Sequence, residues 1–289
     1  MDLAQWRKHI DAVVRDEGQW VGISDENGLP LYELSGTLTF PESHLSAASA
    51  EVTVQVQPGD RVLDDLVGDG LGEVDAEGRL VPHSGQTRLL VLVRAGERRA
   101  ATVTHSVVSG VSVPSQIVVH GVDLLDGLST WPCPSIPAVW ESAEFSEWST
   151  DASGEQYATK RDLAQVQFTT RIDHYLERGP AKTVLREVIQ DSFDAVNTLN
   201  GWSDDPHAVV AYESGEDTSP EIIVRINDDP VMDTIAEHAR SAGVGIEVGL
   251  WWPGDDPVTV RVAHDSTETK QATWPHPIQV VRLTDFREA

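Results

Sequence analysis

Histidines are the residues of this sequence best suited to acid–base chemistry or metal binding. Three of the 10 histidines, His105, His120 and His174, are far apart in the sequence, which gives no reason to expect them to meet. Glu237-His238 falls on an expected helix, but no second histidine follows at the four-residue spacing that places two imidazoles on one face. A surface histidine is the better interpretation of His238. We therefore expect no transition-metal site built on histidine.

Carboxylates in a glycine-rich stretch, residues 68–78, are a second set of possible ligands. They are Asp69, Glu73, Asp75 and Glu77. Their oxygens suit calcium, but their spacing does not match an EF-hand loop, so a solvated acidic loop is predicted. Paired carboxylates could also serve glycoside hydrolysis, yet 47 acidic residues offer so many pairs that none is informative.

Motifs for cofactor binding and nucleophilic catalysis are missing from the sequence. The run from Gly243 to Gly249 resembles a dinucleotide loop only superficially, because it follows an expected helix and opens a strand. A phosphate-binding loop leads from a strand into a helix N-terminus instead. There is no Walker A, His-Glu-x-x-His or Gly-x-Ser-x-Gly pattern. We expect no enzyme activity, no catalytic residue and no cofactor.

Tryptophans are more informative than the charged groups. Trp131, Trp140 and Trp148 lie in or beside an irregular, proline-rich segment, and Trp251 and Trp252 end an expected strand. For each tryptophan alone, burial in the core is the safer interpretation. Three in an irregular segment make a protein interface about equally plausible. Trp131, Trp140 and Trp148 are therefore candidate interface residues.

The composition describes a globular and strongly acidic protein. Lys and Arg total 21 against 47 Asp and Glu, which gives a net charge of −26 over 289 residues. Such an excess opposes binding to DNA, RNA or anionic lipid, whose affinity comes largely from cationic side chains. We expect no tight nucleic-acid binding.

The cysteine count and the apolar runs indicate the cellular compartment in which the chain folds. Cys133 is the single cysteine, so neither a disulfide framework nor a cysteine zinc cluster can form within the chain. The opening residues lack the layout of a signal peptide, and no apolar run approaches the length of a membrane span. We expect folding in the cytosol of the producing cell and no membrane anchor.

The elements that must position these residues are mostly strands in the first half. Apolar alternation and turn residues between the runs predict strands. The predicted runs are 31–40, 51–57, 88–94, 101–108 and 116–119. The run 88–94 is apolar throughout and indicates a strand covered on both faces. Many short strands are typical of a barrel or sandwich.

The second half mixes helices and strands. The prolines between Trp131 and Pro137 break the pattern, so two domains are predicted, 1–145 and 146–289. Helical spacing predicts helices over 180–199, with proline at the first position, and 230–243, capped by Asp229. The remaining predictions are a strand pair 208–212 and 221–226, a hairpin 244–252 and 257–263, and a last strand 278–283.

Several segments together carry a likeness to a known family. They are Trp20-Val21-Gly22-Ile23-Ser24-Asp25, 34–40 and 50–54; then 89–93, 101–103, 119–125 and 131–137; then 179–181 with its helix and the helix 230–244. They resemble the tail-tip proteins of siphophages of actinobacteria, in particular minor tail proteins related to baseplate-hub (tail-associated) subunits. The likeness spans most of the chain.

The resemblance implies an α+β, β-rich fold with an N-terminal β-barrel-like domain and a mixed α/β second half. It implies a structural minor tail protein in the hub that closes the tail tube of a long-tailed bacteriophage and lets DNA pass. The implied partners are further copies in a ring, as a homotrimer, the distal tail or tube protein, the tape-measure protein and other minor tail proteins. The implied location is the virion tail tip, after synthesis in the host cytoplasm. No catalytic residue is implied.

An acidic channel wall would repel the passing DNA, which suits a charge of −26. The acidic proteome of a host would explain the same charge. Two other function classes stay open: a tail-associated cell-wall hydrolase and a carbohydrate-binding receptor module with exposed tryptophans.

Overall fold

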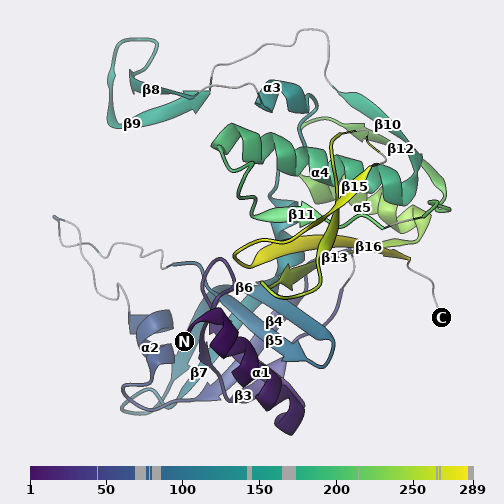
Figure 1. Ribbon diagram of the computed structural model, residues 1–289. Coiled ribbons are helices and arrows are strands. Elements are labelled where there is room, and N and C mark those ends of the chain that lie inside the picture. The colour runs from purple at the N-terminus through teal and green to yellow at the C-terminus, as the bar shows by residue number, and fades with distance from the viewer. Residues whose placement is uncertain are drawn as a thin grey trace. The chain divides into compact units, whose positions relative to one another are not determined.

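The structure is a computed structural model (Figure 1). It describes residues 1–43, 45–68, 76–77, 79, 86–141, 145–164, 174–213, 215–264, 266 and 268–285. Strands account for about 40% of the residues and helices for about 26%. The β-rich α+β class predicted from the sequence is therefore confirmed. Within the described residues, no helix is both long enough and apolar enough to cross a membrane.

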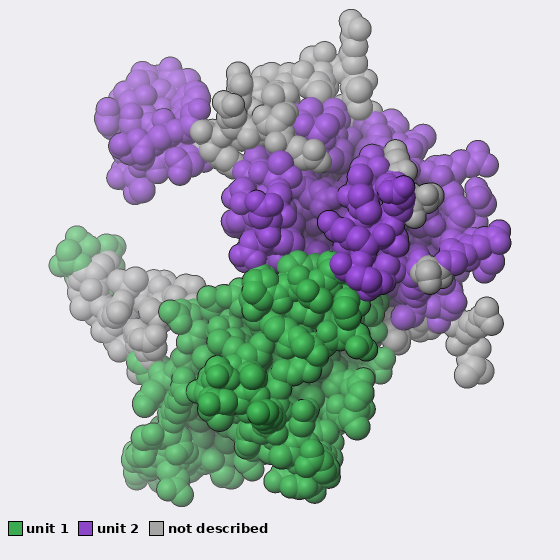
Figure 2. All heavy atoms as spheres, viewed as in Figure 1, with its two compact units in different colours: residues 1–126, 246–258, 272–282 green, residues 127–245, 259–271, 283–289 purple. Residues whose placement is uncertain are grey.

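The chain divides into two compact units, which Figure 2 shows in different colours. Unit 1 comprises residues 1–126, 246–258 and 272–282, and unit 2 comprises residues 127–245, 259–271 and 283–289. This division does not coincide with the predicted domains 1–145 and 146–289, because two segments from the C-terminal part of the chain belong to unit 1.

Unit 1 is built on one antiparallel sheet. Its strands are β1 (Gln19–Ser24), β2 (Pro30–Glu33), β3 (Gly36–Thr39), β4 (Ser49–Gln55), β5 (Leu89–Arg94), β6 (Glu97–Ser109) and β7 (Gln116–Asp123). Their order is β2-β1-β5-β6-β7-β4-β3. All five strand runs predicted for the first half are present, and the run 31–40 is divided between β2 and β3.

The two edge strands of this sheet, β2 and β3, are consecutive in the chain with two residues between them. On one edge the Leu34 N–H donates to the Val21 carbonyl at 2.8 Å, and on the other Gly36 pairs with Val54. The sheet is therefore rolled until its two edges meet at one corner. A Cβ on Gly36 would overlap the Thr53 carbonyl oxygen, so this corner requires glycine. The strand order shows no pairing of β2 with β3, so the described strands form no closed barrel and that part of the prediction is not confirmed.

Apolar clusters cover both faces of the rolled sheet. One fills the inside of the roll, and the other lies against helix α1 (Leu3–Glu17), which Figure 1 shows beside the sheet. Alternate residues of β5 enter the two clusters: Leu90 and Leu92 point into the roll, and Leu89 and Val91 point toward α1. This confirms the prediction of a strand covered on both faces.

Helix α1 has no counterpart among the predicted elements. It begins with a capping box, in which the Gln5 N–H donates to Asp2 at 2.8 Å and the Asp2 N–H donates to Gln5 at 3.0 Å. Trp6 and Ile10, four residues apart, are its buried residues. This capping box followed by an apolar i, i+4 pair is the signal in the sequence that identifies the helix.

Short helical turns complete unit 1. They are α2 (Arg61–Leu63), the π-helical turn η1 (Asp64–Gly68) and the 3-10 turn η2 (Leu124–Ser129), which continues into unit 2. Asp65 of η1 accepts a bidentate contact from Arg88, at 2.7 and 3.0 Å, and a hydrogen bond from the Tyr32 hydroxyl at 2.9 Å. These contacts fasten η1 to the start of β5. Strands β13 (Val244–Trp251) and β16 (Ile278–Asp285) contain residues of both units.

Unit 2 is organised around helix α4 (Ala181–Asn200), whose apolar face includes Leu185, Ile189 and Phe193. A second helix, α5 (Val231–Ala242), contacts α4 and ends at Gly243 in the left-handed conformation, with φ 68°. Both predicted helices are therefore confirmed. Proline occupies the N-cap of each helix rather than the first helical position, and the predicted cap from Asp229 is wrong.

The other elements of unit 2 are short. They are α3 (Pro137–Glu141), β8 (Phe145–Thr150), β9 (Gln156–Ala164), β10 (Tyr175–Pro180), β11 (Ala208–Val210), β12 (Glu221–Ile226), β14 (Val258–Arg261) and β15 (Thr269–Ala272). Two predicted pairings are wrong: β12 pairs with β10 rather than with β11, and β14 pairs with β15 rather than with β13. Strands β8 and β9 form a two-stranded hairpin, and β8 lies in the stretch that was predicted to be irregular.

The N-terminus of α4 is capped by a distant loop. Asp217 accepts from the Thr183 N–H and hydroxyl, both at 2.7 Å, and the Ser219 hydroxyl accepts from the Lys182 N–H at 3.0 Å. Partial burial raises the pKa of Asp217, but hydrogen bonds from Ser219 and Thr183 outweigh it and lower the pKa to about 2. The ionised Asp217 therefore stabilises the start of α4.

Replacing Asp217 with alanine is expected to lower the free energy of unfolding by about 1 kcal/mol near neutral pH, because the first turn of α4 loses an acceptor. The folded pKa lies below the unfolded value of about 3.9, so this stabilisation is present above about pH 4 and disappears as the pH falls toward 2. Urea unfolding at several pH values measures the difference. The exposed Asp204→Ala is the control, and equal losses in both variants would contradict the capping role.

Candidate functional site

The main group of buried charges in unit 2 surrounds Arg261 of β14. Glu187, Asp191 and Asp194 are spaced i, i+4 and i+7 on α4 and therefore share one face. Arg261 donates to Asp191 at 2.6 Å, to Asp194 at 2.7 Å and to Glu187. The side chains of Arg261 and Asp191 are only 5% and 7% exposed. His264 Nδ1 lies 2.9 Å from Asp191 Oδ1.

The electrostatics of this group favour a fixed ion pair. Burial alone would lower the pKa of Arg261, but the acidic groups around it outweigh burial and raise the pKa. Burial raises the pKa of Tyr212, with a further contribution from Glu187, to which the hydroxyl donates at 3.0 Å. Tyr212 therefore remains a protonated donor, and three carboxylates share one permanent guanidinium charge.

Glu187, Asp191 and His264 could in principle hold a metal ion. Their possible ligand atoms lie within 4.8 Å of one another, and they form the one such group found in the described parts of the chain. Arg261 already contacts both carboxylates, so a cation there would face a fixed positive charge. The better interpretation is a structural network that joins β14 to α4. Sequence reasoning missed it, although acids at i, i+4 and i+7 on a predicted helix were a usable signal.

A second buried charge group lies in unit 1, in the turn after β13. Asp255 accepts from Arg7 at 2.9 Å, from Arg98 at 2.5 Å and from the Trp252 N–H at 2.8 Å. The Arg98 guanidinium lies 3.8 Å from the centre of the Trp252 ring, and the indole N–H donates to the Gly28 carbonyl at 3.0 Å. This group attaches the turn to α1 and β6, so its role is structural.

The outer face of β6 and β7 brings together two histidines that the sequence singles out. His105 and His120 are paired across the strands, and their rings stack with centroids 4.5 Å apart and an angle of 14°. His120 Nδ1 lies 3.4 Å from a Glu51 carboxylate oxygen, and the Thr104 hydroxyl lies 3.1 Å from His105 Nδ1. They line an open hollow of about 390 Å³. That size is within the range of small-ligand sites, but the hollow is open.

Comparison with known proteins adds no family to these observations. The chain matches no protein-family model and no curated protein.

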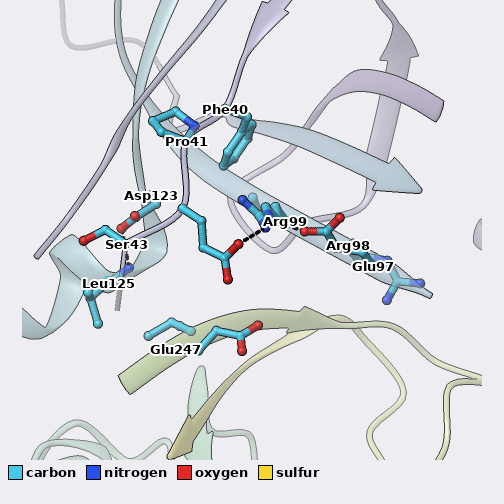
Figure 3. A pocket seen from close by; sticks show the side chains of 12 residues that line it. Phe40, Pro41, Ser43, Glu97, Arg98, Arg99, Asp123, Leu125 and Glu247 are labelled. Carbon is cyan, nitrogen blue, oxygen red and sulfur yellow. Dashed lines mark hydrogen bonds and ion pairs between the residues drawn. The ribbon is translucent and has the colours of Figure 1, made fainter. Parts of the chain in front are cut away.

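A smaller hollow in unit 1 is lined in part by paired charges (Figure 3). Arg99 contacts Glu42 at 2.8 Å and also Glu97, and the Asp123 carboxylate accepts from the N–H groups of Ala48 and Leu125. Burial raises the pKa of Asp123, and these N–H groups oppose that rise. The volume is about 100 Å³ and lies below that of small-molecule sites. This hollow therefore gives no support to a receptor module.

The three candidate interface tryptophans differ in their surroundings. The Trp131 indole donates to the Ser192 carbonyl at 3.0 Å and meets Phe193 edge-on, so it packs on α4 of its own unit. Trp140 is half-buried on α3. Trp148 is 48% exposed on the β8–β9 hairpin. An isolated two-stranded hairpin is marginally stable, so Trp148 best fits the interface prediction, which stays a prediction.

The other sequence-selected residues do not join a common site. His174 precedes β10 in unit 2, and His238 is half-buried on α5. Asp69, Glu73 and Asp75 of the acidic loop lie outside the described residues, and Glu77 pairs with Arg79 at 3.0 Å on the surface. Gly243 ends α5 and β13 follows it, as predicted for a run that is not a nucleotide loop.

The longest stretch without Asp, Glu, Lys or Arg is residues 100–122, which form most of β6, its turn and β7. A stretch of this length would carry about five such residues at the 24% of the whole chain. We call it the neutral hairpin. Three of its valines, Val107, Val111 and Val113, are 50%, 105% and 54% exposed. Exposed apolar side chains without charges are typical of the centre of a protein contact.

Proposed function

We propose that this chain is a non-enzymatic assembly protein, a structural minor tail protein of a long-tailed bacteriophage, located in the tail tip as part of the baseplate hub. The observation that carries the proposal is the rolled seven-stranded sheet of unit 1 with its neutral hairpin. A protein of charge −26 that keeps one exposed surface free of charge is suited to contacts with other proteins.

The rolled sheet fits the barrel-like domain that the sequence resemblance implies. Its two edges meet at Leu34. Buried apolar side chains from the five inner strands fill its interior, and partly buried side chains of the edge strands β2 and β3 pack against this cluster. Two segments of the resemblance, residues 20–25 and 34–40, form β1 and the β2–β3 corner. These are the elements that would give a hub subunit its tube-like wall.

The charge of the chain fits passage of DNA through an assembled channel. An acidic wall repels phosphates and keeps the passing duplex from sticking. The proposed partners are further copies in a closed ring, a trimer in the resemblance, together with the distal tail or tube protein, the tape-measure protein and other minor tail proteins. Contacts with them would use surfaces poor in charge, since like charges oppose a ring of acidic copies.

Quantitative mass spectrometry of purified phage particles tests this function. We expect the chain in the particle at about three copies, as for one closed trimeric ring. Absence from the particle, or a copy number near that of the major tube protein, would contradict the proposal.

The enzymatic alternative has its own measurement. Purified protein is added to host cell walls, and turbidity and zymogram bands are followed. We expect no lysis, and lysis that a carboxylate substitution removes would favour the hydrolase instead.

A further inference from the structure

We propose that the outer half of β6, residues Thr104–Ser109, pairs edge to edge with the same strand of a second copy of this chain. The inference goes beyond the proposed function: a twofold pair cannot be the contact that repeats around a ring of three copies, so it concerns the free chain in solution. The contact itself is argued from the strand's edge, its charge and its exposed side chains.

The outer half of β6 lacks a partner strand on one side. Strand β5 pairs with β6 only as far as Thr102, and the Val103 N–H donates to the Arg88 carbonyl at 2.8 Å. Beyond Val103, no backbone group of the described residues pairs with this edge, although η1 contacts part of β6. The other side of residues 105–109 is paired with β7. A row of backbone donors and acceptors is thus available for another strand.

Two common protections against strand pairing are missing from this edge. Natural edge strands are commonly blocked by charged side chains, especially lysine, or by proline. Residues 104–109 contain neither, and Val107 is 50% exposed at the middle of the segment. An open, apolar edge strand of this kind is a template for strand addition.

The lack of charged side chains on the outer half of β6 indicates that its partner is a second copy of this chain rather than a different protein. In antiparallel self-pairing around a twofold axis, a charged residue near the axis faces the same charge in the copy, which is destabilising. A different partner could carry opposite charges, so its binding would not require a neutral edge. The outer half of β6 lies within a 23-residue stretch without charged residues, in a chain of −26.

Side chains of β6 alternate between the outer and inner faces of the sheet, which determines the residues that would meet when two copies pair. Val107 pairs with Val118 on the outer face, whereas Val108 packs against the interior cluster. Self-pairing near residue 107 would therefore bring the two Val107 side chains together on one continuous outer face. The stacked pair of His105 and His120 would lie beside this contact.

Long-range repulsion between two copies opposes the pair. Raising salt screens that repulsion, so self-association is expected to strengthen between about 50 mM and about 500 mM salt. Since a twofold contact closes after two copies, the product in solution is a dimer.

Sedimentation velocity of the full chain tests the pairing over about 1 to 100 µM, a range that covers weak protein pairs. Val107→Lys is expected to weaken the dimer at least about tenfold, because it places two lysines opposite each other. Val262→Lys in unit 2 is the matched control, since Val262 is 49% exposed, and it should leave the dimer unchanged. Circular dichroism checks that both variants fold.

A charge exchange separates self-pairing from a general surface effect. Val107→Lys and Val107→Glu should each be monomeric, whereas their equimolar mixture should regain a dimer because opposite charges now face each other. A wild-type chain that stays monomeric at high salt, or a dimer that Val107→Lys leaves intact, would overturn the inference. Neither result changes the copy number in phage particles, so failure here is distinguishable from failure of the proposed function.

Discussion

Replacing Arg261 with alanine is expected to lower the free energy of unfolding by about 3 to 5 kcal/mol. Arg261 is the cation to which Glu187, Asp191 and Asp194 all bind, and its side chain is 5% exposed. Removing it leaves the buried Asp191 without its guanidinium, and an unpaired buried charge costs far more than a surface pair contributes. Urea unfolding followed by circular dichroism measures the loss.

Arg240→Ala is the matched control for this prediction. Arg240 also pairs with an acid of the same unit, Glu237 at i−3, but its side chain is 58% exposed. Its removal should change the free energy of unfolding by no more than about 0.5 kcal/mol. Similar losses in the two variants would show that burial does not govern the Arg261 network.

Replacing Trp252 with alanine is expected to destabilise unit 1 by about 3 to 5 kcal/mol. Trp252 is fully buried, lies under the Arg98 guanidinium and donates its indole N–H to the Gly28 carbonyl. The substitution removes the packing of a large ring and leaves the Gly28 carbonyl without this donor. The measurement is the shift in urea midpoint at constant slope.

Two further substitutions separate the contributions of Trp252. Trp252→Phe keeps an aromatic ring for Arg98 but loses the indole N–H, so its loss should be smaller than that of alanine. Trp202→Ala removes an indole that is 39% exposed and should cost less than about 1 kcal/mol. A Trp252→Ala loss as small as that of Trp202→Ala would contradict the central role of this residue.

Local patterns of the sequence identify the elements better than their partners. The alternation in β4 and the apolar run of β5 predict those strands, and helical spacing predicts α4 and α5. These signals come from neighbouring residues, so they can be interpreted without knowledge of the fold. The pairing of β12 with β10, rather than with β11, depends on how α4 and its loops return the chain. No local pattern carries that information.

The candidate sites show the same contrast between local signals, which the sequence carries, and long-range contacts, which it does not. The stacked His105 and His120 meet because the β6–β7 hairpin places them opposite each other, although they are 15 residues apart. If the sequence had identified the turn between β6 and β7, the register of the hairpin would have predicted this pair. The Arg261 network needs a strand residue to meet a helix over 60 residues earlier, so the sequence predicts only the acidic half. Lack of charge in residues 100–122 was visible in the sequence, but its meaning depends on the open edge of β6.

The hydrogen bond from Trp252 to Gly28 spans 224 residues of the chain. During synthesis, β1 and α1 therefore emerge long before the side chain that completes their core. At about 5 to 20 residues per second, the ribosome needs roughly 10 to 45 s to make the intervening chain. Through this interval Trp6, Trp20 and Leu89 lack one of the residues that bury them. Unit 1 therefore cannot complete this core until Trp252 has been synthesised, and its nascent form presents an apolar surface to chaperones until then.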